Sequence, residues 1–249
     1  MSAVMIDVRD LVQRIGTQEI LRGFSIPVIK GETLVLLGRS GGGKSVFLRH
    51  LIGLMKPISG QILVEGVDIT HFNERQLEAV RRKIGMVFQD GALFDSMSVF
   101  ENVAFPLRER GERSEVVIAR KVEETLALVN MGGHEKKMPV NLSGGMRKRV
   151  ALARAIVSPP EVILYDEPTA GLDPIVSDSI NRLIRRMQRQ LAATSIVVTH
   201  DMVSCYHIAD RVALLNEGRV YFYGTTEELK RSEDPVIRDF VDGRSDEAE

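Results

Sequence analysis

The chain has 249 residues, of which 44% are hydrophobic and 27% are charged, proportions that are ordinary for a folded globular protein. Its 33 Lys and Arg residues against 34 Asp and Glu residues give a formal net charge of −1, which argues against a general attraction to nucleic acid or anionic lipid. A single cysteine excludes an intrachain disulfide framework. No apolar run reaches the roughly 18 residues of a membrane-spanning helix, so we expect a cytoplasmic protein.

Short aliphatic and β-branched runs alternate with helical segments in the first 90 residues and again after residue 160. Leu34–Leu37 and Val162–Leu164 are apolar without alternation, which is typical of parallel strands covered on both faces. The predicted helices Lys44–Leu54 and Ile175–Leu191 follow strands, as in α/β crossover units. The predicted strands are Val4–Val8, Phe24–Ile29, Thr33–Leu37, Gln61–Val64, Ile84–Phe88, Val162–Tyr165, Ser195–Thr199, Arg211–Leu215 and Val220–Tyr223.

The middle of the chain has a different pattern. Strand signals disappear from about Gly91 to Pro160, and apolar residues recur at helical spacing. We therefore predict one domain over residues 1–249, with an α/β core at 1–90 and 160–225, an inserted α-helical subdomain at 91–159 and a short helical tail at 226–249. The tail should hold the helices Thr226–Arg231 and Pro235–Val241. One face of a helix in the insert is predicted from Val116, Ala119, Val122, Thr125, Leu126 and Val129.

A glycine-rich segment after the strand Thr33–Leu37 matches G-x-x-x-x-G-K-[ST] in full and precedes a predicted helix, which is the context of a phosphate-binding loop. Glycines let successive N–H groups point at one anion, and the helix N-terminus adds its dipole. Lys44 would contact the β- and γ-phosphates, and the Ser45 hydroxyl would bind Mg²⁺. The alternative, a glycine-rich turn that binds nothing, is disfavoured by the complete match. The predicted phosphate-binding residues are Gly38, Arg39, Ser40, Gly41, Gly42, Gly43, Lys44 and Ser45.

Two acidic residues, Asp166 and Glu167, end a second apolar strand. Side chains of neighbouring strand residues diverge, so the two carboxylates can take different roles. Asp166 would orient Mg²⁺, and Glu167 would accept a proton from the attacking water as a general base. Alone, this pair fits a solvated turn equally well; the phosphate loop earlier in the chain favours a nucleotide site.

A second anion site is predicted where Ser143 caps a helix that opens with Gly144 and Gly145. One nucleotide cannot readily use both sites of one chain. The sequence therefore suggests a head-to-tail homodimer in which each chain closes the nucleotide site of the other. A helix that simply begins with glycines and carries a basic, solvated face is the alternative.

Taken in order, these motifs resemble those of an ABC-type ATPase subunit over nearly the whole chain. That resemblance implies a P-loop NTPase (RecA-like) α/β core with an antiparallel β edge. The matching segments are Gly38–Ser45 (Walker A), Gln89 (Q-loop), Leu142–Met146 (signature), Val162–Asp166 (Walker B), Ala170–Asp173 (D-loop) and His200 (switch histidine).

The resemblance also implies roles for individual residues in ATP hydrolysis. Glu167, His200, Lys44 and Gln89 would be catalytic, and Ser45, Gln89 and Asp166 would hold Mg²⁺. Ser143, Gly144, Gly145 and Asp173 would meet the ATP of the opposite chain. Ile15 stands where the family usually has an aromatic residue that stacks on adenine, so we expect loose base preference and measurable GTP use.

The segment Phe88–Leu107, in which Gly-Ala-Leu-Phe follows the Q-loop, resembles Mla/Mce-type (MlaF-like) lipid-transport ATPases, as do Met146 and Asp234–Gly243. This implies phospholipid transport between inner and outer membranes, from the cytoplasmic face of the bacterial inner membrane. Implied partners are an MlaE-like permease, an MlaD-like MCE-domain protein and an MlaB-like STAS-domain protein, with no nucleic acid. The D-loop reads Gly-Leu-Asp, whereas some Mla members have Gly-Gln-Asp.

Two other functions stay open. The first is the ATPase of a polar amino-acid or ion importer, which would use the same mechanism. The second is a non-transport ABC protein that acts on DNA or ribosomes. The short spacing between Lys44 and Ser143 leaves no room for a long coiled coil, and the balanced charge also disfavours this second alternative.

Overall fold

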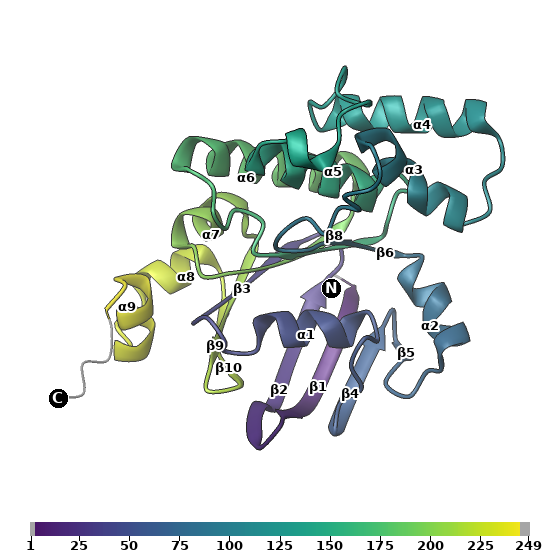
Figure 1. Cartoon of the computed structure of the whole chain (residues 1–249). Helices are drawn as coiled ribbons and strands as arrows, with labels where there is room; N and C mark the ends of the chain where they lie inside the picture. Colours follow the sequence, from purple (N-terminus) through teal and green to yellow (C-terminus); the bar gives the residue numbers. More distant parts are fainter. Residues whose placement is uncertain (1–2, 245–249) are drawn as a thin grey trace. The chain divides into compact units, whose positions relative to one another are not determined.

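The computed structural model describes residues 3–244, which form two compact units (Figure 1). The first unit combines the residues up to Arg81 with those from Thr194 onward, and the second covers Arg82–Ala193. The tail predicted at 226–249 belongs to the first unit, and its residues 245–249 lie outside the described part.

An antiparallel sheet occupies the start of the first unit, with the strand order β2-β1-β4-β5. Val8 on β1 pairs with Ile26 on β2 and with Ile62 on β4, and all three side chains are buried. The sheet therefore presents one apolar face to the interior of the unit. Its elements are β1 (Val4–Ile15), β2 (Gln18–Ile29), β4 (Ser59–Val64) and β5 (Val67–Asp68), followed by the helix α2 (Glu74–Arg81).

The other strands of this unit have the order β10-β9-β3-β8, with β3 parallel to both β8 and β9. Leu37 of β3 pairs with Thr199 on one side and Leu214 on the other. Every residue of β3 is buried, as the unbroken apolar run predicted. The elements are β3 (Thr33–Gly38), α1 (Lys44–Leu51), β8 (Thr194–Thr199), α7 (Met202–Ile208), β9 (Arg211–Asn216), β10 (Arg219–Gly224), α8 (Thr226–Arg231) and α9 (Pro235–Val241).

Helix α1 packs against β2 of the antiparallel sheet. The rings of Phe24 on β2 and Phe47 on α1 are fully buried, with their centroids 4.8 Å apart. Such pairs add specific aromatic contact to the burial of large apolar area. The packing therefore fixes the helix that follows the phosphate loop.

The second unit has two parallel strands, β6 and β7, and is otherwise helical. Residues larger than glycine are excluded at Gly85 of β6, because a Cβ there would lie 2.6 Å from the Ala155 carbonyl oxygen of α5. This close approach seats the signature helix α5 directly against the strand. The elements are β6 (Ile84–Val87), α3 (Val99–Glu109), α4 (Glu115–Leu128), the 3₁₀ turn η1 (Pro139–Asn141), α5 (Gly144–Ile156), β7 (Val162–Asp166) and α6 (Pro174–Leu191).

All nine predicted strands are present, several of them longer than predicted, and no strand lies between residues 91 and 160 of the described chain. The predicted face of the helix α4 was wrong at Val116, which is 81% exposed; Ile118 is buried instead, beside Val122, Thr125 and Leu126. Helix α1 ends at Leu51 rather than Leu54, and Gly53 just beyond it has a left-handed backbone (φ +66°). The elements β5 and α2 were missed.

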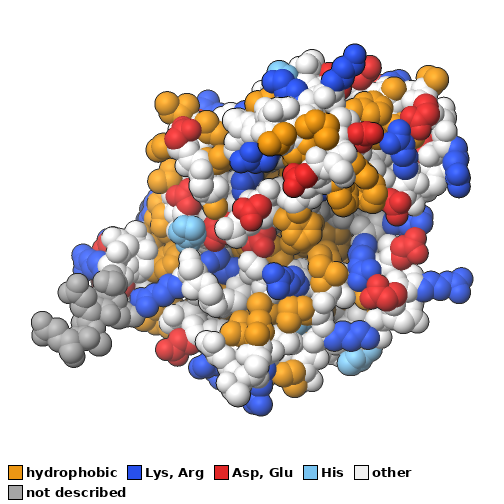
Figure 2. Space-filling model, viewed as in Figure 1, with side chains coloured by type: hydrophobic (Ala, Val, Ile, Leu, Met, Phe, Trp, Pro, Cys, Tyr) orange, Lys and Arg blue, Asp and Glu red, His pale blue; other side chains and the backbone are white. Residues whose placement is uncertain are grey.

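Charge is mixed over the surface. Figure 2 shows acidic and basic side chains interspersed with hydrophobic ones on the face drawn. Among the helices of residues 3–244, none is long and apolar enough to cross a membrane.

Candidate nucleotide-binding and hydrolysis site

The phosphate loop joins the end of β3 to the start of α1. Gly41 and Gly43 have left-handed backbones, with φ +75° and +103°. A Cβ on Gly43 would also lie 2.9 Å from Ile20 Cγ2, and one on Gly42 would lie 3.0 Å from the Arg39 carbonyl oxygen. Glycine is therefore required here by backbone conformation and by close packing.

Lys44 bends back over this loop. Its side chain is buried, and Nζ donates to the carbonyl oxygens of Gly38 at 2.7 Å and Arg39 at 3.1 Å. The first turn of α1 has no acidic residue, and Gly43 offers no side-chain cap to its N–H groups. A phosphate at this helix end would meet both the lysine charge and the positive end of the helix dipole.

His200 lies at the same edge of the sheet as the phosphate loop. Parallel pairing of Leu37 with Thr199 places both segments just beyond the carboxyl ends of neighbouring strands. His200 is exposed, and Asp201 after it caps α7 by accepting from the Val203 N–H at 2.9 Å. Lys44 and His200, the two predicted γ-phosphate contacts, thus both follow neighbouring strands at this edge of the sheet.

In the second unit, the predicted Q-loop and Walker B residues also share one sheet edge. Val87 of β6 pairs with Tyr165 of β7, so Gln89 and the pair Asp166–Glu167 lie at the carboxyl ends of adjacent parallel strands. Asp166 and Glu167 are each only 8% exposed. Glu167 has φ +44°, a conformation that non-glycine residues adopt rarely and that is common at functional sites.

The signature residues lie beside the D-loop. Ser143 caps α5, its hydroxyl accepting from the Met146 N–H at 3.3 Å. A Cβ on Gly144 would lie 3.0 Å from Leu172 Cδ2, and one on Gly145 would lie 2.6 Å from Val176 Cγ1. The glycines thus serve packing against the start of α6 as well as exposing N–H groups.

Asp173 has a local role that the sequence analysis did not include. Its Oδ1 accepts from the Ile175 and Val176 N–H groups, both at 3.0 Å, and so caps the 18-residue helix α6. This contact fixes the D-loop where it enters the helix.

The predicted Mg²⁺ ligands are a hydroxyl (Ser45), an amide (Gln89) and a carboxylate (Asp166). All three offer the hard oxygen atoms that Mg²⁺ prefers, and Mg²⁺ commonly takes few protein ligands together with substrate phosphates. No cluster of three or more His, Cys, Asp or Glu side chains suited to a metal occurs within residues 3–244. The donor chemistry therefore fits a metal that binds with the nucleotide.

Two further side chains of the second unit were missed. Lys148 was given no role in the predicted site, and only the alternative interpretation of this helix placed it on a basic, solvated face; it is buried on α5. The sequence could have indicated that Lys148 is buried, because the apolar residues Ala151 and Leu152 lie three and four positions later on the same helical face. Asn102 is also fully buried, and its amide donates to the carbonyl oxygens of Phe94, Met97 and Ser98.

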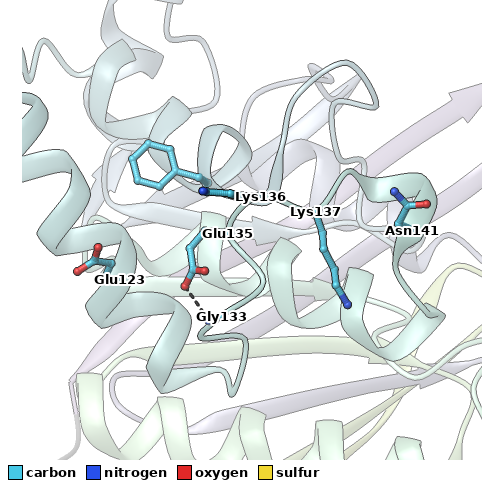
Figure 3. Close-up of a pocket in the computed structure, with 7 residues that line it drawn as sticks. Glu123, Gly133, Glu135, Lys136, Lys137 and Asn141 are labelled. Carbon is cyan, nitrogen blue, oxygen red and sulfur yellow. Dashed lines mark hydrogen bonds between the residues drawn. The ribbon is translucent and has the colours of Figure 1, made fainter.

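A hollow of about 620 Å³ opens beside the start of α3, and none of the predicted site residues lines it (Figure 3). Within it the Gly133 N–H donates to Glu135 Oε1 at 2.9 Å. Backbone bonds from Val99 to Lys137 and from Phe100 to Glu135 join its wall to α3. Its lining residues are Phe100, Glu123, Gly133, Glu135, Lys136, Lys137 and Asn141.

Comparison with known proteins agrees with this geometry. The family model described as "ABC transporter" matches residues 21–170, and the chain belongs to that family. It is an ATP-binding, ATP-hydrolysing ABC ATPase with an antiparallel β subdomain and a helical region.

Its relatives include ATP-binding proteins that are named for two different transport systems. The chain is 44% identical over 241 residues to the "probable ribonucleotide transport ATP-binding protein mkl" of Mycobacterium tuberculosis, covering 97% of this chain and 67% of the relative. It is 40% identical over 246 residues to the "intermembrane phospholipid transport system ATP-binding protein MlaF" of Haemophilus influenzae, covering 99% and 93%. These relatives place it with the Mla/Mce-type ATPases.

A similar solved structure is the ATP-binding cassette MJ0796, in a dimeric post-hydrolysis state bound to ADP and Pi. The TM-score is 0.81 at 29% identity, over 89% of this chain and 98% of that one.

Proposed function

We propose that this chain is the ATPase subunit of an ABC system that moves phospholipid between the inner and outer membranes. The observation that carries the proposal is the 40% identity to MlaF over 99% of the chain. Its place would be peripheral, at the cytoplasmic face of the bacterial inner membrane.

In this proposal two copies form a head-to-tail homodimer, and each ATP meets residues of both. The dimeric state named for MJ0796 supports the arrangement. Val140 and Ile175 are close in sequence to the signature and the D-loop, and each is 82% exposed. Exposed apolar side chains of this kind are expected at a surface that a second chain covers. The N–H groups at the start of α5, with the hydroxyl of Ser143, would contact the γ-phosphate bound by the opposite chain.

The proposed roles in hydrolysis follow from residue chemistry and from the resemblance of the motifs to those of ABC ATPases. Lys44 and the loop N–H groups bind the phosphates, and His200 donates to the γ-phosphoryl oxygens as their charge develops. Glu167 accepts the proton of the attacking water. Asp166 would orient Mg²⁺, and Gln89 would respond to the metal and to the transport partner. Mg²⁺, held by Ser45, Gln89 and Asp166, would neutralise phosphate charge.

The segment from Gln89 to Phe105 would bind the permease. Phe94 is 41% exposed, its ring centroid lies 4.9 Å from that of Phe105, and the Arg154 guanidinium lies 5.8 Å from it. The buried amide of Asn102 holds the backbone beneath, so the exposed ring sits on a fixed loop. Val103 and Ala104, by contrast, are buried and pack the unit itself.

The proposal is tested by purifying the full chain from membranes with its partners and identifying both proteins and lipids by mass spectrometry. We expect a permease of the MlaE kind, an MCE-domain protein and bound phospholipid, with a STAS-domain protein as a fourth component. A periplasmic amino-acid receptor in their place would favour the importer. Reconstituted complex that moves ribonucleotides and not phospholipid would overturn the lipid assignment.

A further inference from the structure

Lys148 is the one residue of the Arg147–Arg149 run that is buried, with 8% of its surface exposed. Arg147 beside it turns outward and donates to the Leu142 carbonyl oxygen at 2.8 Å. A lysine seldom lies inside a protein unless its charge has partners. The roles proposed above leave this side chain unused.

The Lys148 ammonium joins two loops of the nucleotide site. Its Nζ donates to the carbonyl oxygen of Gln89 and, at 3.2 Å, to the carbonyl oxygen of Glu167. These residues follow β6 and β7, 78 positions apart in the chain. One cation on α5 therefore binds the backbone of both loops.

The surroundings of Lys148 act on the pKa of its ammonium in opposite directions. Burial is the larger effect and leaves the pKa of Lys148 below its usual value, whereas the carboxylates of Asp90, Asp166 and Glu167 act to raise it. Three acidic groups thus offset part of the cost of burying the cation. A neutral side chain of the same length would leave these carboxylates without that compensating charge.

Glu167 is the residue whose backbone needs such support. Its φ of +44° lies in the left-handed region, which an L residue keeps only when its surroundings hold it there. Its carbonyl oxygen accepts from Lys148 Nζ and from the Ala170 N–H at 3.2 Å. The direction of the Glu167 side chain depends on this peptide.

We propose that Lys148 is a positioning residue for ATP hydrolysis, fixing the peptides of Gln89 and Glu167 relative to each other. The inference rests on the proposed role of Glu167 as general base. It implies that a movement of the Q-loop peptide is passed to the general base through one side chain. In this proposal Lys148 acts through these two peptides and not by contact with ATP or the attacking water.

The test compares steady-state ATP hydrolysis by the full chain carrying Lys148→Met, Lys148→Gln or Lys148→Arg. Methionine keeps most of the unbranched side chain and removes both hydrogen bonds, glutamine keeps a neutral donor, and arginine keeps the charge and the donors. Arg149→Met is the matched control, because Arg149 on the same helix donates to Val129 O and Ser179 Oγ and to neither loop. Glu167→Gln is assayed in parallel, with melting temperatures for every variant.

We expect Lys148→Met to lower kcat at least about tenfold with KM for ATP nearly unchanged, because a misplaced reacting group costs turnover rather than binding. Lys148→Arg should restore most of kcat, and Arg149→Met should lose stability with a much smaller loss of kcat. If Lys148→Met does not fold, the test is whether kcat is higher in Lys148→Arg than in Lys148→Gln.

Normal kcat in Lys148→Met, or a loss no larger than in Arg149→Met at equal melting temperature, would overturn the positioning role. The same holds for a rise in KM with kcat unchanged. Continued hydrolysis by Glu167→Gln would instead refute the general base, and so separates failure of the proposed function from failure of this inference.

Discussion

Asp173 allows a structural contact to be separated from an interface role. Its Oδ1 caps α6 through two 3.0 Å hydrogen bonds, and replacing an Asp cap by Ala costs about 1 kcal/mol, within a range of about 0.5–2. For a chain of this size about 1 kcal/mol lowers the melting temperature by roughly 2–4 °C. Asparagine caps as well as aspartate, so Asp173→Asn should lose only the charge–dipole term of about 0.3–1 kcal/mol.

We therefore expect Asp173→Ala to lower both stability and ATP hydrolysis, and Asp173→Asn to keep most of the stability while losing turnover. Thermal unfolding followed by circular dichroism, together with a phosphate-release assay, measures the two effects. Ser114→Ala is the control, because Ser114 caps α4 of the same unit and has no part in the proposed site. The reasoning fails if Asp173→Asn melts as low as Asp173→Ala, or if Asp173→Ala melts like the unaltered chain.

Glu167→Gln should bind ATP normally and stall as a dimer with hydrolysis nearly abolished, which size-exclusion chromatography with ATP will reveal; a monomer under these conditions contradicts the composite site. Lys44→Ala should weaken ATP binding about 10- to 100-fold, the loss of a charged hydrogen bond, measured by calorimetry, and unchanged affinity would remove Lys44 from the site. Burial and the nearby Asp201 carboxylate raise the pKa of Cys205 to about 12, so alkylation at pH 8 should be slow in the folded chain and fast in denaturant. Equal rates would show that the thiol is accessible. GTP should be hydrolysed at a measurable rate, because Ile15 is aliphatic and half exposed; strict exclusion of GTP would argue against an adenine site at this residue.

Much of the fold could be predicted because its strands are short, apolar and bounded by turns. Leu34–Leu37 is buried on both faces, as an unbroken run predicts. Thr225 and Glu228 form the capping box that their spacing indicates. Sequence periodicity failed at Val116, because the start of α4 projects its side chain away from the interior.

The candidate site could be predicted only as a set of motifs. Its individual residues were predicted because glycines, a lysine and carboxylates stand at fixed offsets. The Lys148 contacts could not be predicted from the sequence. Their acceptors are the backbone carbonyl oxygens of Gln89 and Glu167, and every residue has such an oxygen whatever its type. The left-handed conformation of Glu167 is equally hidden, since it comes from tertiary context and not from residue type.

The 2.6 Å approach that a Gly145 Cβ would make to Val176 Cγ1 limits how this protein can vary. A larger residue at position 145 is compatible with the same packing only if position 176 becomes smaller, since both atoms compete for one volume. In a randomised library selected for transport, the two positions should therefore change together or stay as they are. An engineer who redesigns the start of α6 is at the same time redesigning residues that we propose meet the nucleotide.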